Sequence, residues 1–552
     1  MLLAGQTMAR PVGAVAGDAA IASAHPLATE AGIEILHAGG NAFDAAVAVS
    51  AALAVVEPYS SGLGGGGFWL LHLADSGRDL MVDGREKAPL GAHRDMYLNE
   101  RGEVVPRASM DGPLAAGIPG EPAALAHIAR RYGRLSLKRS LAPAIRLAEQ
   151  GFAVDAVYQR MAGWRKAALA RYPMAAKVFL DDGEPPAIGQ LIRQPGLAAT
   201  LKRLARFGRN GFYAGPVARE LVRAARAGGG IWRLADLAGY RVIEREPVKG
   251  DFMDWRITSA ALPSSGGIVL VEMLNMLEAA GWADRPPLQR LTLMIEAMRR
   301  AYRDRAMYLG DSDFIDVPLK MLVSKAHAGR LIADYDPVHA SPSQPMAASK
   351  EGHHTTHFSI ADRDGNRVSA TLSVNYPFGS GFIAGDTGVL LNDEMDDFSA
   401  KPGVPNVYGL VGNQANAIAP GKRMLSSMSP TFVETPDGVA IVGTPGGSRI
   451  ITMLLQAILA MRDSDDPADW VTRPRIHHQY LPDRLQFEPG ALNAEQWQAL
   501  RRRGYVLDAK KRPWGNMQAV RLDKRGGRAT AASDPRGIGA SQVIDARAST
   551  TH

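Results

Sequence analysis

Cysteine is absent from the 552 residues of this chain. The absence excludes a disulfide framework, a thiolate zinc site, an iron–sulfur cluster and a cysteine nucleophile. It does not fix a compartment, because a chain without thiols is compatible with reducing and oxidising surroundings alike. Hydrophobic residues make up 46% of the sequence and charged residues 22%, which argues against disorder, a fibre or a coiled coil.

Long apolar runs are also missing. The longest, residues 45–56, is too short to cross a bilayer and ends at Glu57-Pro58, so we expect no membrane span. Residues 1–12 carry no positive charge before Arg10 and no adequate apolar stretch, so we recognise no secretory signal. We expect a cytoplasmic protein by default, or a periplasmic or secreted one if a leader was removed.

Positive charge is in modest excess, with a formal net charge of +7 and a pI near 9.4. The basic residues are scattered, and the densest groups, residues 501–503 and 510–512, lie at and beyond the end of a predicted helix over 493–503. Cations suit the negative end of a helix dipole. We interpret both groups as a solvated face and expect no nucleic-acid partner.

The first part of the chain has mainly helical patterning. Ala-rich apolar periodicity predicts packed helices over 27–37 and 41–56, and a glycine run then leads into strands over 68–73 and near 80–85. Residues 122–334 are predicted to be mostly helical. This half of the chain therefore contributes a helical layer and a few core strands.

The pattern changes at residues 340–354, whose Pro, Ser, Ala and Gly content predicts an exposed, mobile connection. Directly afterwards, 355–360 alternates as a strand and returns over 367–374 after an Asp-Gly-Asn turn, which predicts a β-hairpin. More strands are predicted up to about Val442, followed by an amphipathic helix over 450–461.

Several well-known motifs are missing or out of context. The chain has no Gly-x-Ser-x-Gly element, which removes the simplest α/β-hydrolase interpretation. Gly62, Gly64 and Gly67 fit the letters of a dinucleotide loop, but they follow a helix and open a strand, the reverse of the required context. Gly421-Lys422-Arg423 lacks the Ser or Thr of a Walker loop. Phosphate binding is therefore not expected.

Two clusters resemble metal ligands only superficially. His353, His354 and His357 have no Glu-x-x-His context, so structural or surface roles are favoured over a metal site. The acidic residues within 393–397 lack the alternating spacing and glycine of a calcium loop, and such a cluster is more often a solvated turn.

Thr355 stands at the start of the predicted hairpin, directly after the connection. A threonine inside a chain is a poor nucleophile because no base comes with it. If the bond between His354 and Thr355 were cut, the new α-amino group, with a pKa of about 7.7–8.0, would serve as a base for the threonine hydroxyl. From these residues alone, the β-propensity of Thr-Thr at a strand start stays the favoured alternative.

The resemblance to a known family is not limited to Thr355. From about Ala22 to the end, the sequence resembles the γ-glutamyltranspeptidase (glutathione hydrolase) family of N-terminal nucleophile hydrolases. The ordered matches are residues 40–46, Glu57-Pro58, residues 60–62 with the glycines after them, Asp83, Arg85-Glu86, Ala88-Pro89, Thr355-Thr356-His357, Asn392, residues 395–399, residues 426–430 and residues 445–449. So many matches in one order are very specific.

The resemblance implies an α+β fold, a four-layer αββα sandwich. It also implies a precursor that cuts itself between His354 and Thr355 into a large subunit, residues 1–354, and a small subunit, residues 355–552, which stay paired. Thr355 is then the nucleophile. Ser373 stands where the family usually has a second, supporting threonine, and serine keeps the hydroxyl but loses the methyl group that restricts χ1.

The resemblance also implies the substrate and oxyanion groups. Arg85, with Ser426 and Ser427, corresponds to the binding site for an α-carboxylate, and Asn375, Glu394 and Asp397 correspond to the residues that hold an α-ammonium. Gly446 and Gly447 correspond to the glycines whose N–H groups form the oxyanion hole. Tyr408 resembles the tyrosine of a lid loop over the pocket.

The function implied is a self-processing γ-glutamyltransferase and glutathione hydrolase, which passes the glutamyl group through a threonine ester to water, an amino acid or a dipeptide. No metal or organic cofactor is implied. Two alternatives stay open: a glutaryl or cephalosporin acylase of the same family, and an unprocessed, non-catalytic binding member. The carboxylates of Glu394 and Asp397 favour the γ-glutamyl substrate, since a glutaryl group has no ammonium for them to bind.

Overall fold

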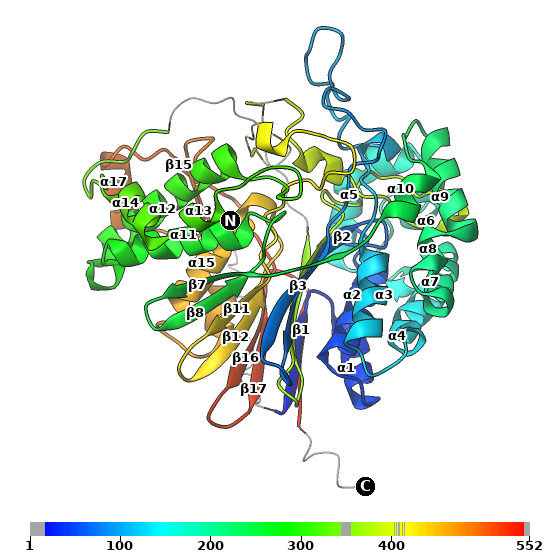
Figure 1. The fold of residues 1–552 in the computed structure, drawn as a ribbon, viewed down its shortest axis with the longest axis horizontal. Helices are drawn as coiled ribbons and strands as arrows, with labels where there is room; N and C mark the ends of the chain where they lie inside the picture. The colour runs from blue at the N-terminus through cyan, green and yellow to red at the C-terminus, as the bar shows by residue number, and fades with distance from the viewer. Residues whose placement is uncertain are drawn as a thin grey trace, which may run out of the picture.

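The computed structural model describes residues 17–343, 355–401, 403–404, 406, 409–410, 412 and 414–545. Two β-sheets lie face to face in the middle of the molecule, and a layer of helices covers the outer face of each (Figure 1). The predicted four-layer αββα sandwich is therefore confirmed. Within the described residues, no helix is both long and apolar enough to cross a membrane.

The first sheet has seven strands and joins both halves of the sequence. Its order is β18 (Ala540–Ile544), β1 (Ala19–Ser23), β9 (Thr356–Ala361), β10 (Arg367–Ser373), β2 (Gly66–Leu73), β3 (Arg78–Gly84) and β6 (Ile243–Arg245). The central strands β9 and β10 form the predicted hairpin, in which Thr356 faces Leu372. Because β1 and β2 flank this hairpin, the N-terminal half of the chain holds it on both sides.

The second sheet has six strands, all antiparallel to their neighbours. Its order is β17 (Ala529–Ser533), β16 (Gln518–Asp523), β12 (Gly438–Gly443), β11 (Thr431–Glu434), β8 (Trp255–Ser259) and β7 (Val248–Phe252). Buried Phe68 and Leu70 of the first sheet belong to the same apolar core as Phe432 and Ile441 of the second. Burial of these side chains holds the two inner faces together.

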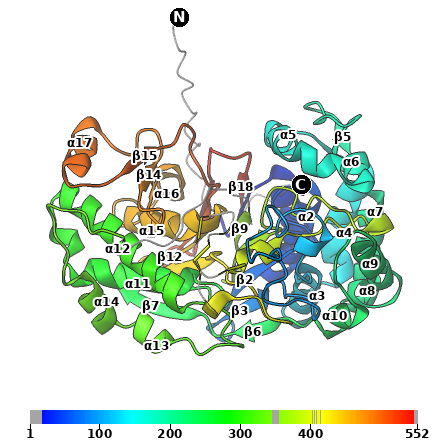
Figure 2. The ribbon, with the colours of Figure 1, turned by 90° about the horizontal axis from the view of Figure 1, so that it is seen from above.

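The helices divide between the two outer faces, as the view from above shows (Figure 2). Helices on the first side are α1 (Pro26–His37), α2 (Ala42–Val56), α3 (Glu121–Arg131), α4 (Leu137–Gln150), α5 (Ala156–Ala170), α6 (Pro173–Phe179), α7 (Pro195–Phe207), α8 (Asn210–Tyr213), α9 (Gly215–Ala227) and α10 (Leu234–Gly239). Helices on the second side are α11 (Gly266–Ala279), α12 (Pro287–Tyr308), α13 (Leu319–Leu322), α14 (Lys325–Ile332), α15 (Ile450–Ala460), α16 (Pro467–Thr472) and α17 (Ala494–Arg502). Small sheets of β4 (Phe152–Ala153) with β5 (Leu191–Ile192), and of β13 (Ile476–His477), β14 (Leu485–Phe487) and β15 (Leu507–Ala509), lie outside the sandwich.

Helix α2 shows why the predicted helices were reliable. The Asn41 side chain accepts from the backbone of Phe43 and Asp44, while Asp44 accepts from the backbone of Asn41, a complete capping box. All 15 residues of the helix are buried, as its unbroken apolar run predicts. Strong local signals at both ends and a continuous core face therefore fix this element.

The prediction of a mostly helical region over 122–334 was wrong for residues 243–259, which form β6, β7 and β8. The β7–β8 hairpin is only a few residues long on each arm, too short to give a clear periodicity. Pairing of β8 with β11, more than 170 residues later, completes its hydrogen bonds. The strand structure thus depends on a tertiary contact.

Most of the predicted connection over 340–354 lies outside the described residues. Its first residues are not detached from the fold. Ala340 donates its backbone N–H to the Arg503 carbonyl, and Ser343 donates its own to Asp483. Residues 340–343 are at least partly exposed, as predicted, but these hydrogen bonds attach them to the rest of the fold.

Candidate active site

Thr355 lies at the point where the central hairpin begins. The next residue, Thr356, pairs with Leu372, so the register brings Ser373 opposite Thr355. Thr355 is buried, and both side chains line one small cavity of about 20 Å³. Figure 2 shows β9 near the centre of the molecule, between the two helical layers.

The two residues after Thr355 have structural surroundings. The Thr356 hydroxyl donates to Glu57 at 2.6 Å, and the His357 ring bonds the hydroxyls of Thr371 at 2.8 Å and Ser359 at 3.2 Å. Burial lowers the pKa of His357 to about 3, so its ring is neutral. His357 is therefore committed to the sheet, while His353 and His354, with the predicted cleavage bond, lie outside the described residues.

Arg85 forms the centre of a buried charge cluster. It follows β3 directly, and its guanidinium lies 2.6 Å from Glu394 Oε2, 2.5 Å from Asp397 Oδ2 and 3.4 Å from Glu86 Oε2. The predicted carboxylate-binding and ammonium-binding residues are therefore in direct contact with each other. The arginine therefore pairs with carboxylates on two separate segments of the chain.

Burial and mutual interaction shift the pKa values of this cluster. Burial lowers the pKa of Arg85, but the neighbouring carboxylates, Glu394 first, raise it above its ordinary value, so the arginine stays charged. Burial raises the pKa of Glu394 to about 7; Asp397 adds to that shift and Arg85 opposes it. Burial thus favours the protonated form of Glu394, while Arg85 favours the carboxylate.

The remaining predicted polar residues line the same small cavity. The Ser373 hydroxyl accepts the backbone N–H of Asn375 at 2.8 Å, and the Asn375 side chain donates to the Asp393 carbonyl at 3.0 Å. Ser426 accepts the backbone N–H of Met428 at 3.1 Å. These contacts fix the orientation of each side chain before any ligand arrives.

Arg305, on α12, is a site residue that the sequence interpretation missed. Its guanidinium donates to the hydroxyls of Ser427 at 3.1 Å and Ser265 at 2.9 Å. Burial lowers the pKa of Arg305 although Asp397 acts in the opposite direction. A single arginine in an arginine-rich helix gives no local signal of such a role, so only the three-dimensional contacts identify it.

Gly446 and Gly447 form the turn after β12 and open the short helix that leads into α15. Their φ angles are +146° and +56°, conformations that glycine adopts without a Cβ clash. A Cβ atom on Gly446 would come within 2.5 Å of Met453 Cε. Gly447 lines the small cavity with Thr355, so a backbone turn that needs glycine lies beside the predicted nucleophile.

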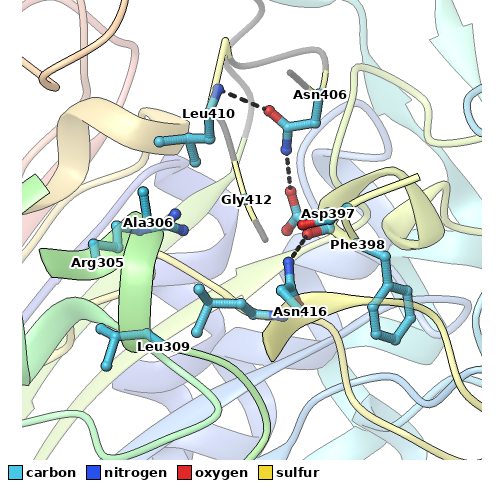
Figure 3. A pocket seen from close by; sticks show the side chains of 11 residues that line it. Arg305, Ala306, Leu309, Asp397, Phe398, Asn406, Leu410, Gly412 and Asn416 are labelled. Atoms are coloured by element: carbon cyan, nitrogen blue, oxygen red, sulfur yellow. Dashed lines mark hydrogen bonds between the residues drawn. The ribbon is translucent and has the colours of Figure 1, made fainter. Parts of the chain in front are cut away.

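The predicted lid lies close to this cluster. Asn406 donates to Asp397 Oδ1 at 3.3 Å and accepts the backbone N–H of Leu410, as Figure 3 shows. Leu410 also lines the small cavity with Thr355. Tyr408 itself lies outside the described residues.

We call the small cavity the inner pocket. It is lined by Arg85, Thr355, Ser373, Asn375, Glu394, Asp397, Leu410, Ser426, Ser427, Met428, Gly447, Ser448 and Ile450. Every predicted catalytic and substrate-binding residue lines it except Gly446, which lies next to Gly447 and borders a second cavity that also reaches Thr355. Segments from both halves of the chain therefore meet at one point.

A separate group of side chains has the composition of a metal site. Among the described residues, Glu272, Asp304 and His327 have ligand atoms within 4.8 Å of one another. His327 Nε2 lies 2.7 Å from Asp304 and 3.5 Å from Glu272, and hydrogen bonding to these acids raises its pKa. Hydrogen bonds between the histidine and the two acids account for this contact among α11, α12 and α14, and the group does not line the inner pocket.

Comparison with known sequences agrees with this geometry. A family model described as gamma-glutamyltranspeptidase matches residues 28–544. The glutathione hydrolase proenzyme of Pseudomonas sp. (strain A14) is 44% identical over 88% of this chain and 85% of that protein. The proenzyme of the same name from Escherichia coli (strain K12) is 41% identical over 94% of this chain and 90% of that protein.

Comparison with solved structures supports the fold. The crystal structure of cephalosporin acylase from Bacillus halodurans has a TM-score of 0.87 and 28% identity, over 99% of this chain and 100% of that one. The sandwich architecture is thus shared over the whole length of both chains. With the family model covering nearly all of the sequence, the chain belongs to the γ-glutamyltranspeptidase family.

Proposed function

We propose that this protein is a self-processing γ-glutamyltransferase and glutathione hydrolase. The observation that carries the proposal is the grouping, around one buried pocket, of a threonine at a strand start, a turn of two glycines and an arginine paired with two carboxylates. Each group suits one part of a γ-glutamyl amide. The names of the sequence relatives agree with it.

The charge cluster suits the free end of a γ-glutamyl group, which carries both an α-carboxylate and an α-ammonium. Arg85 binds the carboxylate with Ser426 and Ser427, while Glu394, Asp397 and Asn375 bind the ammonium. A zwitterion places a carboxylate opposite Arg85 and an ammonium opposite Glu394 and Asp397, so the net charge of the cluster does not change when it binds. A singly charged ligand disturbs that balance, so the pocket discriminates by charge.

The chemistry is acyl transfer through a covalent ester. Thr355 Oγ attacks the γ-carbonyl, its proton passes to the α-amino group of the same residue, and the amide C–N bond breaks as the amine leaves with that proton. The N–H groups of Gly446 and Gly447 hold the oxyanion, and Ser373 supports the nucleophile. Water or an amine then breaks the ester and releases the threonine.

This mechanism requires Thr355 to be a chain end, so the proposal includes cleavage between His354 and Thr355. The products are the large subunit, residues 1–354, and the small subunit, residues 355–552. Strand β9 of the small subunit pairs with β1 of the large one, and β10 pairs with β2. These ladders hold the two subunits together after the cut. No nucleic-acid partner is part of the proposal.

A second candidate is a cephalosporin or glutaryl acylase, which the similarity to the Bacillus halodurans acylase structure favours. A glutaryl group has the carboxylate for Arg85 but lacks the ammonium for Glu394 and Asp397. Its binding leaves two buried carboxylates with a weakened partner. The γ-glutamyl substrate therefore fits this pocket better.

Processing and turnover are tested together. The purified protein should give two bands on a denaturing gel and hydrolyse γ-glutamyl-p-nitroanilide faster than glutaryl-p-nitroanilide. Thr355→Ala should abolish both cleavage and turnover, whereas Thr472→Ala, a threonine on α16 that lines neither the inner pocket nor the second cavity at Thr355, should keep both. A single unbroken chain with full activity, or γ-glutamyl hydrolysis by Thr355→Ala, contradicts the mechanism. Preference for the glutaryl anilide supports the acylase instead.

A further inference from the structure

Thr355 and Gly446 also line a second cavity of about 520 Å³, which we call the outer cavity. Its lining residues are Glu57, Tyr59, Ser60, Val157, Arg160, Met161, Trp164, Thr355, Pro445, Gly446, Arg449, Lys510, Lys511, Arg512, Pro513, Trp514, Gly515, Asn516, Arg536 and Gly537. The inner pocket and the outer cavity therefore meet at Thr355. With the glutamyl group in the inner pocket, the amine side of the amide lies in the outer cavity.

The lining of the outer cavity is strongly basic. Six of its side chains are cationic and only one, Glu57, is acidic. Three of the six cations bind residues that do not line the cavity. Arg536 binds Glu488 at 2.7 Å, Lys510 binds Asp508 at 2.8 Å, and Arg449 donates to the Gln486 amide oxygen.

The other three cations, Arg160, Lys511 and Arg512, have no carboxylate within ion-pair distance in the part of the chain that the structure describes. All three side chains are exposed to solvent. They come from two different elements, α5 and the loop after β15, and face the same space. The solvated basic group over 510–512 is therefore also part of a cavity wall.

We propose that the outer cavity binds the amine substrate and leaving group, and that Arg160, Lys511 and Arg512 select acidic peptides there. The inference rests on the proposed function and names the acceptor class for the same site. An acidic peptide supplies carboxylates to three unpaired cations, while its amine attacks the threonine ester. In that step the amine nitrogen forms a new amide bond to the γ-carbonyl carbon, and the ester bond between that carbon and Thr355 Oγ breaks. A proton of the amine returns to the threonine oxygen.

Two acceptors of almost equal shape separate charge from size. Glycylglutamate and glycylglutamine differ by one carboxylate, and each is offered to the wild-type protein with γ-glutamyl-p-nitroanilide as donor. The expected KM is about two- to fivefold lower for glycylglutamate, the range that a solvent-exposed ion pair supplies. Because exposed charges are screened, the difference should close at about 0.5 M salt.

A matched pair of variants locates the effect. Lys511→Gln with Arg512→Gln should bring the two KM values together with little change in kcat for transfer, and Arg160→Gln should reduce the gap in part. Lys138→Gln with Arg139→Gln removes an identical, exposed Lys-Arg pair from α4, outside both cavities, and should keep the full gap.

The outcomes separate this inference from the proposed function. If the wild-type protein hydrolyses the anilide but uses both dipeptides equally, the acidic preference is overturned and the γ-glutamyl activity stands. If the α4 variant lowers the preference as much as the 511–512 variant, general charge and not the cavity is responsible, and the site is overturned. A processed protein with no γ-glutamyl turnover overturns both proposals.

Discussion

The two cavities that meet at Thr355 arrange their charged side chains in opposite ways. The inner pocket has little free space, and its ionic side chains are buried and already paired with one another. The outer cavity is much larger, and half of its cations are exposed and unpaired in the described structure. A buried pair is costly to break, whereas an exposed cation is screened by water and salt. The inner pocket should therefore be highly selective for the acyl group, whereas the outer cavity should discriminate only weakly between amines.

Removing Arg85 is the strongest test of this difference between the two cavities. Arg85→Ala leaves the buried Glu394 and the partly buried Asp397 without their arginine partner, which destabilises the folded protein by about 3–5 kcal/mol in comparable cases. The variant also loses the charge-assisted hydrogen bonds to the substrate carboxylate, so we expect kcat/KM for γ-glutamyl-p-nitroanilide to fall about ten- to a hundredfold, mainly through KM. Steady-state kinetics measures the split.

Folding has to be monitored in the same variant, because the change also affects a buried cluster. Arg85→Lys keeps the charge but loses the planar fork, so it should fold and give an intermediate KM. Arg94→Ala removes a half-exposed arginine that lies 4.0 Å from Asp95 and should behave like the wild type. An unchanged KM in folded Arg85→Ala would remove the carboxylate assignment.

The boundary between the two cavities is the glycine turn, and Gly446→Ala tests it. The φ angle of +146° is one that residues with a Cβ atom rarely adopt, so the substitution strains the turn, and the added Cβ also has to displace Met453 Cε, which would lie 2.5 Å away. Displacing an oxyanion donor typically costs about 10²–10³ in kcat. Gly77→Ala is the control, since its φ is also positive but no heavy atom lies within 4 Å; it should keep kcat. A normal kcat in Gly446→Ala would exclude this turn from catalysis.

Glu57 is the one acid that lines the basic outer cavity, and burial raises its pKa from 4.5 to about 7. The folded protein thus holds this proton more tightly than the unfolded chain. Stability should fall as pH rises from about 4.5 to 7, by about 3 kcal/mol for this group. Glu57→Gln has no carboxyl group to ionise and does not lose stability in this way. The Tm of the variant minus that of the wild type should therefore be larger at pH 8 than at pH 5.

The control for this pH effect is Glu30→Gln, an exposed glutamate on α1, which should shift Tm equally at both pH values. If the difference in Tm between Glu57→Gln and the wild type is the same at pH 5 and pH 8, Glu57 is ionised over that whole range. A neutral Glu57 leaves the outer cavity more positive, whereas an ionised Glu57 would offset one of its cations.

Local signals in the sequence predicted the elements that carry the site, but not how the site is assembled. The hairpin of β9 and β10 followed from strand alternation and a short turn, and α2 followed from its cap and apolar run. The β7–β8 hairpin was missed because its hydrogen bonds are completed by β11. Short-range sequence patterns therefore predicted most helices and strands correctly. They failed where a strand depends on pairing with a distant segment.

The site residues were a different problem. Arg85 and Glu394 are 309 positions apart, and no spacing in a single sequence relates them; their roles came from the family resemblance. Arg305 escaped both kinds of reasoning. The interpretation of residues 510–512 as a solvated face was right about exposure, but a flat sequence does not tell which exposed cations share a cavity.

The smallest expected effect belongs to the lid. Asn406 donates to Asp397 in a hydrogen bond of 3.3 Å, slightly longer than the usual range, as Figure 3 shows. A bond of this kind contributes about 1 kcal/mol or less to binding, so Asn406→Ala should raise KM at most about fivefold and leave kcat unchanged. Asn99→Ala, an exposed turn residue, is the control and should leave KM unchanged. A large fall in kcat would mean that Asn406 orients Asp397 during the reaction, and the inner pocket would then depend on its cover as well as on its buried ion pairs.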